Sequence, residues 1–163
     1  MKRLTLIRHA KSSWKDLLLP DSERPLNGRG KRDAPLMGAR LAIAGFKPEL
    51  IVTSPAKRAR KTAAAISKQL SRHPDIVEDP RIYGAGTTDL LDLIGGLPID
   101  LEDVAIVGHN PGLTELANLL ADAGIGNVPT TGVVRLELDI ALWSEVEPGL
   151  GRLVDFDWPK RQT

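Results

Sequence analysis

The 163-residue chain has no cysteine, which excludes disulfide bonds and thiolate chemistry. It also lacks an excess of charge of either sign. Its 22 lysine and arginine residues stand against 21 aspartate and glutamate residues, and a net charge of +1 gives no reason to expect nucleic acid or a membrane surface as a partner. No apolar run approaches the ~20 residues that a transmembrane helix needs, and no signal-peptide pattern follows Met1. We therefore expect a cytoplasmic protein whose function is encoded in local motifs.

The length suits a single domain, residues 1–163, with room for a sizeable core. Short apolar segments of strand length alternate with segments of helical periodicity. Buried strands are expected at residues 4–7, 50–52 and 104–107, a weaker strand at 75–79, and later strands within 132–140 and 151–158. The segment 132–140 alternates in part between apolar and polar residues, as an antiparallel edge strand does.

A long polar segment separates the first strand from the first helix. Residues 10–30 are rich in turn-forming residues, and a loop of this length in a compact domain is usually functional. Apolar residues then recur at helical spacing as far as Ala44, and Gly45 is the expected stop. Pro35 is compatible with this helix only in its first turn, because proline cannot donate a helical hydrogen bond.

The remaining helices are expected between later strands. Ser54 and Pro55 are typical of a helix cap and a first helical residue, and Asn110 with Pro111 repeats the signal. Another helix is expected over roughly 88–94. The alternation of strands and helices predicts an α/β fold: a three-layer α/β/α sandwich with a mainly parallel central sheet and helices on both faces.

Chemically active side chains follow three of the expected strands. Arg8 and His9 follow the first strand. Arg58 comes shortly after the second, and His109 directly follows the strand at 104–107. Ligands of parallel α/β sheets bind outside the carboxyl ends of the strands. We therefore expect two histidines and two arginines to converge at one edge, where helix N-termini add N–H groups that favour an anion.

Arg58 lies in the basic stretch KRARK at the expected start of a helix. Cations are unfavourable there by roughly 0.3–1 kcal/mol each when exposed, so another factor must favour them. A solvated surface position is the simpler interpretation for Lys57, Arg60 and Lys61. Arg58, beside the apolar stripe, is the candidate anion ligand.

The histidines do not form a recognisable metal motif. His73, just past a helix, is expected at the surface. His9 and His109 do not stand in HxH or HExxH spacing, and no third ligand is evident. We expect no metal and no other cofactor.

Three segments resemble motifs of the histidine phosphatase superfamily, the group with an RHG-type motif that includes phosphoglycerate mutases: LIRHAKSSW, SPAKRARKTA and VGHNP. The chain looks most like the SixA-type phosphohistidine phosphatases in RHAKSSW, RPLNGRG, RIYGAG and its short length. The resemblance runs from about residue 2 to at least residue 135. Each motif alone is weak evidence, whereas all three in order at strand ends are strong evidence.

The resemblance implies a role for each matching residue. His9 matches the nucleophile that takes the phosphoryl group, and His109 the second pocket histidine, which stabilises that group. Arg8 and Arg58 match the arginines that grip the phosphate oxygens. Phosphoryl transfer depends mainly on positioning and charge stabilisation, which guanidinium groups supply through bidentate hydrogen bonds.

The sequence departs from the family pattern in the loop after His9. Ala10 replaces the usual glycine, which is a mild change. Mutase-like members carry asparagine after the tryptophan of this loop, but Lys15 follows Trp14 here. Ser12 is therefore the candidate that replaces asparagine as a phosphate ligand.

The general acid of both major subgroups is missing. Most members supply a glutamate before the second histidine, but no carboxylate occurs from Arg81 to Thr88. Other relatives use an aspartate after that histidine, where this chain has Asn110. The candidate substitutes, none of which matches a motif, are Asp16, Asp21, Glu23, Asp79 and Asp89.

Three functions remain open. The leading hypothesis is a metal-independent phosphatase that hydrolyses phosphohistidine on a protein through a covalent enzyme intermediate. The alternatives are a phosphatase for small phosphate esters and a non-catalytic module that binds phosphorylated ligands. The partner is accordingly a phosphorylated protein or a small phosphorylated substrate, with neither nucleic acid nor membrane expected.

Overall fold

The fold is built on one six-stranded sheet. The computed structural model describes residues 1–161. The strand order is β3-β2-β4-β1-β5-β6. Pairing is parallel from β3 through β1 and antiparallel at β5 and β6, so the sheet is mainly parallel, as the sequence predicts. The strands are β1 Lys2–Arg8, β2 Leu50–Thr53, β3 Asp75–Glu78, β4 Asp103–Gly108, β5 Val133–Leu138 and β6 Gly151–Asp157.

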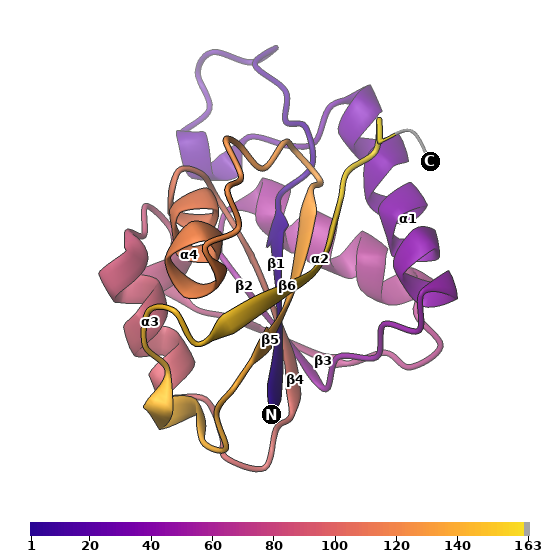
Figure 1. Ribbon diagram of the computed structural model, residues 1–163. Helices are drawn as coiled ribbons and strands as arrows, with labels where there is room; N and C mark the ends of the chain where they lie inside the picture. The colour runs from indigo at the N-terminus through magenta and orange to yellow at the C-terminus, as the bar shows by residue number, and fades with distance from the viewer. Residues whose placement is uncertain (162–163) are drawn as a thin grey trace.

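Helices cover both faces of the sheet and complete the predicted three-layer α/β/α arrangement (Figure 1). Side chains of a strand alternate between faces, and so do those of β1: Leu4 and Leu6 join one core cluster and Ile7 the other. The first cluster includes residues of α3 and α4, and the second includes residues of α1 and α2. The helices are α1 Gly28–Ile43, α2 Lys57–Gln69, α3 Thr87–Gly95 and α4 Gly112–Ala121. Within residues 1–161, no helix has both the length and the apolar character needed to cross a membrane.

Two expectations about the sheet and α1 are wrong. The segment 132–140 does not form an edge strand, because β5 pairs with β1 on one side and with β6 on the other. Pro35 does not lie in the first turn of its helix, because α1 already begins at Gly28.

The early start of α1 has a local cause in Asn27. The Asn27 side chain accepts a hydrogen bond from the Gly30 N–H at 2.9 Å, which caps the helix. The Asn27 N–H donates to the Lys11 carbonyl at 3.0 Å. The start of α1 therefore packs directly on the chain that leaves β1, and a Cβ atom at position 30 would overlap the Lys11 carbonyl oxygen.

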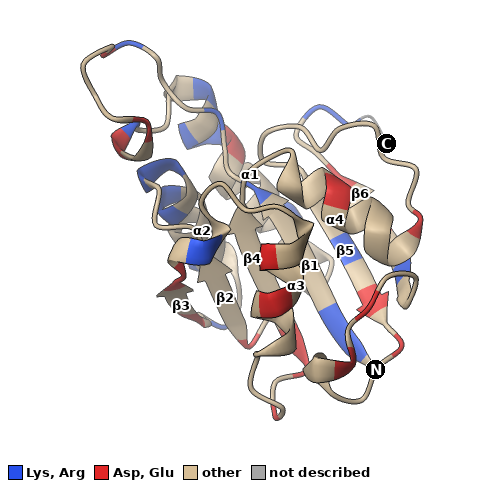
Figure 2. Ribbon diagram, turned by 90° about the vertical axis from the view of Figure 1, so that its left-hand side faces the viewer, with Lys and Arg blue, Asp and Glu red and all other residues tan. Residues whose placement is uncertain are grey.

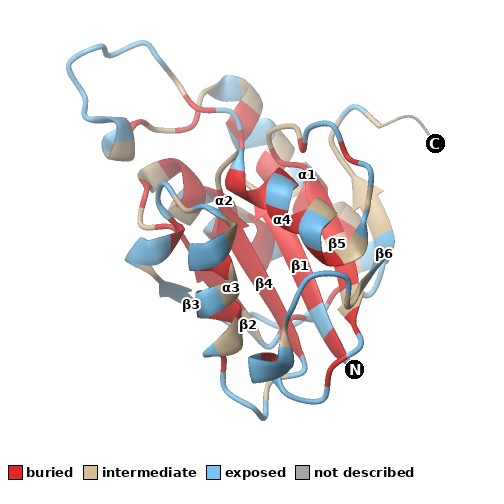
Figure 3. Ribbon diagram, turned by 60° about the vertical axis from the view of Figure 1, so that its left-hand side comes forward, coloured by how far each residue is buried: buried red, intermediate tan, exposed pale blue. Residues whose placement is uncertain are grey.

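The segment between β1 and α1 stands out from the body of the molecule. Figure 3 shows it as a largely exposed loop above α2. The part of this loop that leads to α1 contains a short 3₁₀ helix, η1, at Asp21–Glu23. Two further 3₁₀ helices are η2, Pro80–Ile82, and η3, Trp143–Glu145. The loop lies at the end of the sheet where β1 delivers His9.

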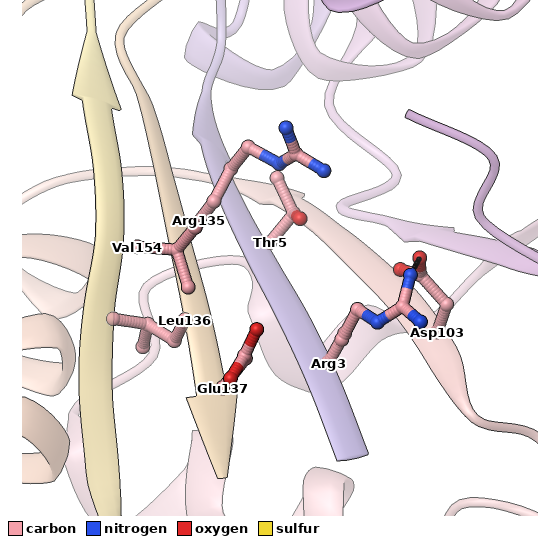
Figure 4. A pocket seen from close by; sticks show the side chains of 7 residues that line it. All are labelled: Arg3, Thr5, Asp103, Arg135, Leu136, Glu137 and Val154. Carbon is pink, nitrogen blue, oxygen red and sulfur yellow. Dashed lines mark ion pairs between the residues drawn. The ribbon is translucent and has the colours of Figure 1, made fainter. Parts of the chain in front are cut away.

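A hollow lies over the amino-terminal part of β1, away from His9 (Figure 4). This cavity of about 180 Å³ is lined in part by Arg3, Thr5, Asp103 and Arg135. Arg3 pairs in register with Asp103, and Thr5 with Arg135, so the hollow lies over the first half of the strand. It is separate from the residues that follow the carboxyl ends of the strands.

The close approach at Gly30 gives a test of how α1 is anchored. We expect Gly30→Ala to destabilise the fold by about 1–3 kcal/mol, the usual scale of forced overpacking, because the methyl group would displace the Lys11 backbone. Gly95→Ala is the matched helical control, since its added methyl group meets nothing within 4 Å. Denaturant-induced unfolding of both variants measures the difference. Equal stability of the two would contradict the packing described.

Candidate active site

The two histidines of the motifs meet at the carboxyl ends of β1 and β4. These strands are parallel neighbours, with Arg8 in register with Gly108. The backbone N–H of His9 donates to the Gly108 carbonyl at 3.0 Å. The ring centroids of His9 and His109 consequently lie 5.1 Å apart.

The chain around His9 is held by backbone hydrogen bonds from two directions. Thr131 donates its N–H to the carbonyls of both Arg8 and His9 at 3.1 Å. The Ala10 N–H donates to the Thr62 hydroxyl at 2.9 Å, and that hydroxyl donates to the Arg58 carbonyl at 2.7 Å. Thr131 adopts a left-handed conformation with φ of 61°, which a β-branched residue rarely does. Such strain, of order 1–3 kcal/mol, persists where surrounding contacts enforce it.

The contacts of His9 define which ring nitrogen carries the proton. Nδ1 lies 2.8 Å from the Ala10 carbonyl oxygen, which can only accept, so Nδ1 is the protonated nitrogen. Nε2 accepts a hydrogen bond from Arg58 Nε at 3.3 Å. Burial lowers the pKa of His9 to about 3, and the positive charges of Arg58 and Arg8 act in the same direction. The ring is therefore neutral at pH 7, with an Nε2 lone pair facing Arg58.

His109 is also held as a neutral ring. Its Nε2 lies 2.8 Å from the Ser54 hydroxyl, and its Nδ1 lies 3.5 Å from Arg58 Nη2. Burial lowers the pKa of His109 to about 4, and the Arg58 charge contributes further. Ser54 is thus a neighbour of the site.

The prediction that Ser54 and Pro55 cap and open a helix is wrong, because α2 begins at Lys57. The Ser54 hydroxyl accepts from the Ala56 N–H at 3.2 Å, inside the turn that precedes the helix. The same hydroxyl contacts His109, so this turn links the start of α2 to the site.

Arg58 occupies the centre of the group and is 6% exposed. It contacts Nε2 of His9 and Nδ1 of His109, as well as the loop that carries Asp21. Figure 2 shows further lysine and arginine residues along the start of α1 and α2, beside this loop. The surroundings of the site are therefore positively charged.

Arg8 places a buried donor beside the site. Its Nη1 donates to the Val128 carbonyl at 3.0 Å, whereas its buried Nε has no partner in the part of the chain that the structure describes. Burial lowers the pKa of Arg8. A buried donor without an acceptor is destabilising by about 1–3 kcal/mol, and a bound anion would satisfy it.

Ser12 contacts an arginine that sequence reasoning missed. Its hydroxyl accepts from Arg24 Nη2 at 2.6 Å. Arg24 also donates from Nε to the Ser13 carbonyl at 3.1 Å, and its guanidinium carbon lies 3.3 Å from the centre of the Trp14 ring. Ser12 thus lies in a hydrogen-bonded wall of the loop, and its role as a phosphate ligand stays a prediction. Arg24 belongs to the segment RPLNGRG, where no pattern distinguishes it from a surface cation.

Asp21 is the carboxylate that reaches the site. Its backbone carbonyl accepts from Arg58 Nη1 at 2.7 Å, and its Oδ2 accepts from Arg58 Nη2 at 2.9 Å. Oδ2 also accepts from the Tyr83 hydroxyl, and Oδ1 accepts from Arg24 at 3.1 Å. The hydrogen bond from Tyr83, followed by those from Arg58 and Arg24, holds the pKa of Asp21 well below its usual range.

Tyr83 is a further residue that sequence reasoning missed. Its ring packs edge-on against His109, with the ring centroids 5.5 Å apart. Its hydrogen bond to Asp21 raises the pKa of the phenol, so Tyr83 keeps its proton at neutral pH. Tyr83 lies in RIYGAG, which has the composition of a loop, and its contact with a residue 62 positions earlier has no signal in the sequence.

The other candidate acids form no hydrogen bond or ion pair with the motif histidines or arginines in the part of the chain that the structure describes. Asp16 accepts from the Leu18 N–H, Asp79 pairs with Arg81 at 2.7 Å, and Asp89 accepts from the N–H of Gly86. Among the five candidate acids, Asp21 alone forms a hydrogen bond within residues 1–161 to a motif arginine or histidine, namely Arg58. No group of three metal-ligating side chains gathers in that part of the chain.

Comparisons with known proteins identify the family. The model of the histidine phosphatase superfamily (branch 1) matches residues 4–83. An uncharacterised protein of Mycobacterium tuberculosis is 32% identical over 165 residues, which cover 94% of this chain and 100% of the relative. The chain belongs to the histidine phosphatase superfamily.

A solved structure places this histidine phosphatase within the SixA type. The proposed phosphohistidine phosphatase SixA from Agrobacterium tumefaciens has a TM-score of 0.81 and 29% identity, over 97% of this chain and 98% of that one. A chloroplastic Arabidopsis thaliana protein, also uncharacterised, is 34% identical over 133 residues, or 76% of this chain. The chain spans 61% of the length of that plant relative. These likenesses support a phosphatase that acts on a phosphorylated substrate.

The protonation states of the site are open to direct measurement. Because burial lowers the pKa of His9 to about 3 and that of His109 to about 4, both rings should stay neutral as the pH falls from 7 to 5. In a histidine-resolved NMR titration, their ring resonances should not shift over this range. Titration of either ring near pH 6.5 would contradict the burial that the structure gives them.

The arginines should carry anion affinity. We expect Arg8→Ala and Arg58→Ala each to weaken vanadate or phosphate binding by about 1.5–3 kcal/mol, the scale of a charge-assisted hydrogen bond. Lys61→Ala removes an exposed cation from α2 and is the matched control, for which calorimetric titration should find little change. Equal losses in all three variants would mean that the anion binds elsewhere.

Proposed function

We propose that the chain is a metal-independent phosphatase that hydrolyses phosphohistidine carried on a protein, through a covalent phosphohistidine intermediate on His9. Its own cationic side chains supply the charge stabilisation that other phosphatases take from metals. Four features support the proposal: the nucleophile, the donors near it, a site that suits an imidazole leaving group, and an exposed apolar loop beside the site.

His9 has the properties of a nucleophile for phosphorus. The ring is neutral, its Nδ1 proton is held by the Ala10 carbonyl, and its Nε2 lone pair is directed to the side where Arg58 lies. A fixed neutral imidazole can attack in line, form a phosphoenzyme and release it to water. A module that only binds phosphate would need the arginines more than such a nitrogen, which weighs against the non-catalytic alternative.

Two arginines supply donors near His9. Arg58 donates to Nε2, and Arg8, whose Nε has no partner among the described residues, lies near enough for its charge to lower the pKa of His9. The ring of His109 lies 5.1 Å from that of His9, centroid to centroid. A hydrogen bond donated by His109 to a phosphoryl oxygen would stabilise the transferring group. Positioning of the reactants and electrostatic stabilisation by such preorganised groups account for most of the catalysis of phosphoryl transfer.

The single observation that carries the choice of substrate is the state of Asp21. It is the carboxylate at the site, and three hydrogen-bond donors hold it ionised, so it has no proton to give. An alkoxide leaving group needs a proton during P–O cleavage, and general acids typically contribute 10²–10⁴-fold. A phosphorylated imidazole that is already protonated on its other nitrogen leaves as a neutral ring and needs no such acid.

The loop beside the site favours a substrate displayed on a protein. Just before Asp21, the side chains of Leu17 and Leu18 are 84% and 94% exposed, and Trp14 is 65% exposed. Exposed apolar groups on a loop that contacts the site suit contact with a protein surface better than contact with a small polar ester. A phosphatase for small phosphate esters is the second candidate, and its alkyl substrates would need a proton donor that the ionised Asp21 does not supply.

A comparison of leaving groups tests the proposal. We expect rapid turnover of a phosphohistidine protein and of aryl phosphates with good leaving groups. Phosphoglycerate should be slower by at least about 10², the low end of the lost acid contribution. The measurement is log kcat/KM against leaving-group pKa, under conditions where chemistry limits the rate.

The slope of that plot decides between the two phosphatase hypotheses. A steep dependence for oxygen esters is the expected result. A flat plot, with phosphoglycerate as good a substrate as phosphohistidine, would reveal an acid and would favour the small-ester function instead.

A further inference from the structure

The carboxylate of Asp21 lies where a negative charge should hinder a phosphatase. It binds Arg58, the cation that the phosphoryl group needs, and a phosphoryl dianion placed beside it would be repelled. The carboxylate is nevertheless held firmly from three sides: by Arg58 of α2, by Tyr83 after η2, and by Arg24 at the end of η1. His109 at the end of β4 is near enough to feel its charge. Such an arrangement requires a function for the charge.

The chemistry of phosphohistidine supplies a function. Phosphorus is bonded to one ring nitrogen, and the other is basic. When the second nitrogen is protonated, the P–N bond breaks with its electron pair returning to the ring, which leaves as neutral imidazole. When it is unprotonated, the ring must leave as an imidazolate anion, which is a far poorer leaving group. An anionic acceptor at the mouth of the site would favour the protonated form.

We propose that the Asp21 carboxylate accepts a hydrogen bond from the distal ring N–H of the substrate phosphohistidine, and thereby selects a protonated imidazole as the leaving group. This inference rests on the proposed function. It makes Asp21 a residue that determines specificity for P–N over P–O substrates, instead of the missing general acid.

The carboxylate has the capacity for this contact. An ionised carboxylate has about four acceptor positions. Within the described residues, Oδ2 accepts from Arg58 and Tyr83, whereas Oδ1 accepts from Arg24 alone. The Asp21 side chain is 46% exposed, so the carboxylate is open to a further donor.

The reaction then balances without an acid. The Nε2 lone pair of His9 attacks phosphorus, the P–N bond of the substrate breaks, and its electron pair neutralises the substrate ring, whose distal nitrogen keeps its proton against Asp21. The phosphoryl group is now on His9, whose ring carries the positive charge with Nδ1 still protonated. Water attacks phosphorus next, the His9 ring regains its lone pair, and dihydrogen phosphate leaves with both protons of the water.

The test is the ratio of two activities in Asp21→Asn. We expect kcat/KM for phosphoimidazole to fall about 10-fold or more, the scale of one charge-assisted hydrogen bond. For p-nitrophenyl phosphate, whose leaving group needs no proton, we expect an unchanged or higher value, because a negative charge has been removed from the mouth. The ratio within one preparation does not depend on the fraction of folded enzyme.

Controls separate this function from a structural one. Asp16→Asn removes a carboxylate from the same loop whose contact is the Leu18 N–H, and both activities should be unchanged. Asp21→Glu keeps the charge and should recover part of the phosphoimidazole rate. The fall in Asp21→Asn should also be larger at pH 8 than at pH 6, since the asparagine no longer favours the protonated substrate ring.

The outcomes are distinct. A parallel fall for both substrates in Asp21→Asn would overturn the inference and leave Asp21 a structural residue of the loop. No change for either substrate would overturn it as well. Failure of the unmodified enzyme to hydrolyse phosphoimidazole or a phosphohistidine protein would instead overturn the proposed function itself.

Discussion

The buried guanidinium of Arg58 is the interaction on which the site depends. It donates to Nε2 of His9, lies against Nδ1 of His109, and binds both the backbone and the side chain of Asp21. One guanidinium thus joins α2, the ends of β1 and β4, and the loop before α1. Its charge helps to keep both histidines neutral, its hydrogen bonds hold the Asp21 loop against them, and we propose that it provides cationic charge for a phosphoryl group. Arg58, a cation in the first turn of α2 where the helix dipole disfavours positive charge, therefore holds the elements of the site together.

The sheet supplies the alignment that this interaction requires. Because β1 and β4 are parallel neighbours, their carboxyl ends bring His9 and His109 together. Both imidazole rings are largely buried there. The strained Thr131 and the hydroxyl of Thr62 fix the backbone on either side of His9. The loop between β1 and α1 is largely exposed, yet its hydrogen bonds bring Asp21 and Arg24 to the site. A rigid sheet edge thus faces an exposed loop, and the substrate ring is expected to bind between them.

The sequence predicts the scaffold better than the loop. Apolar runs of strand length predict all six strands within a few residues, and the three motifs predict which side chains leave the strand ends. The sequence analysis misplaces the start of α1, because the run of turn-forming residues over 10–30 hides the local N-cap signal of Asn27. Arg24 and Tyr83 escape prediction for a different reason. Their importance comes from contacts with Ser12 and Asp21 across the fold, whereas each alone is typical of a surface side chain.

The central claim is that Nε2 of His9 takes the phosphoryl group, and rapid quenching with labelled phosphohistidine protein tests it most directly. The account predicts that acid-labile, base-stable phosphate will be trapped on the enzyme during turnover, and that His9→Ala will abolish the trapped label. His73→Ala should leave it unchanged, because that ring contacts the Ser67 carbonyl, away from the site. Label that persists at full level in His9→Ala would assign the nucleophile to another residue and contradict the account.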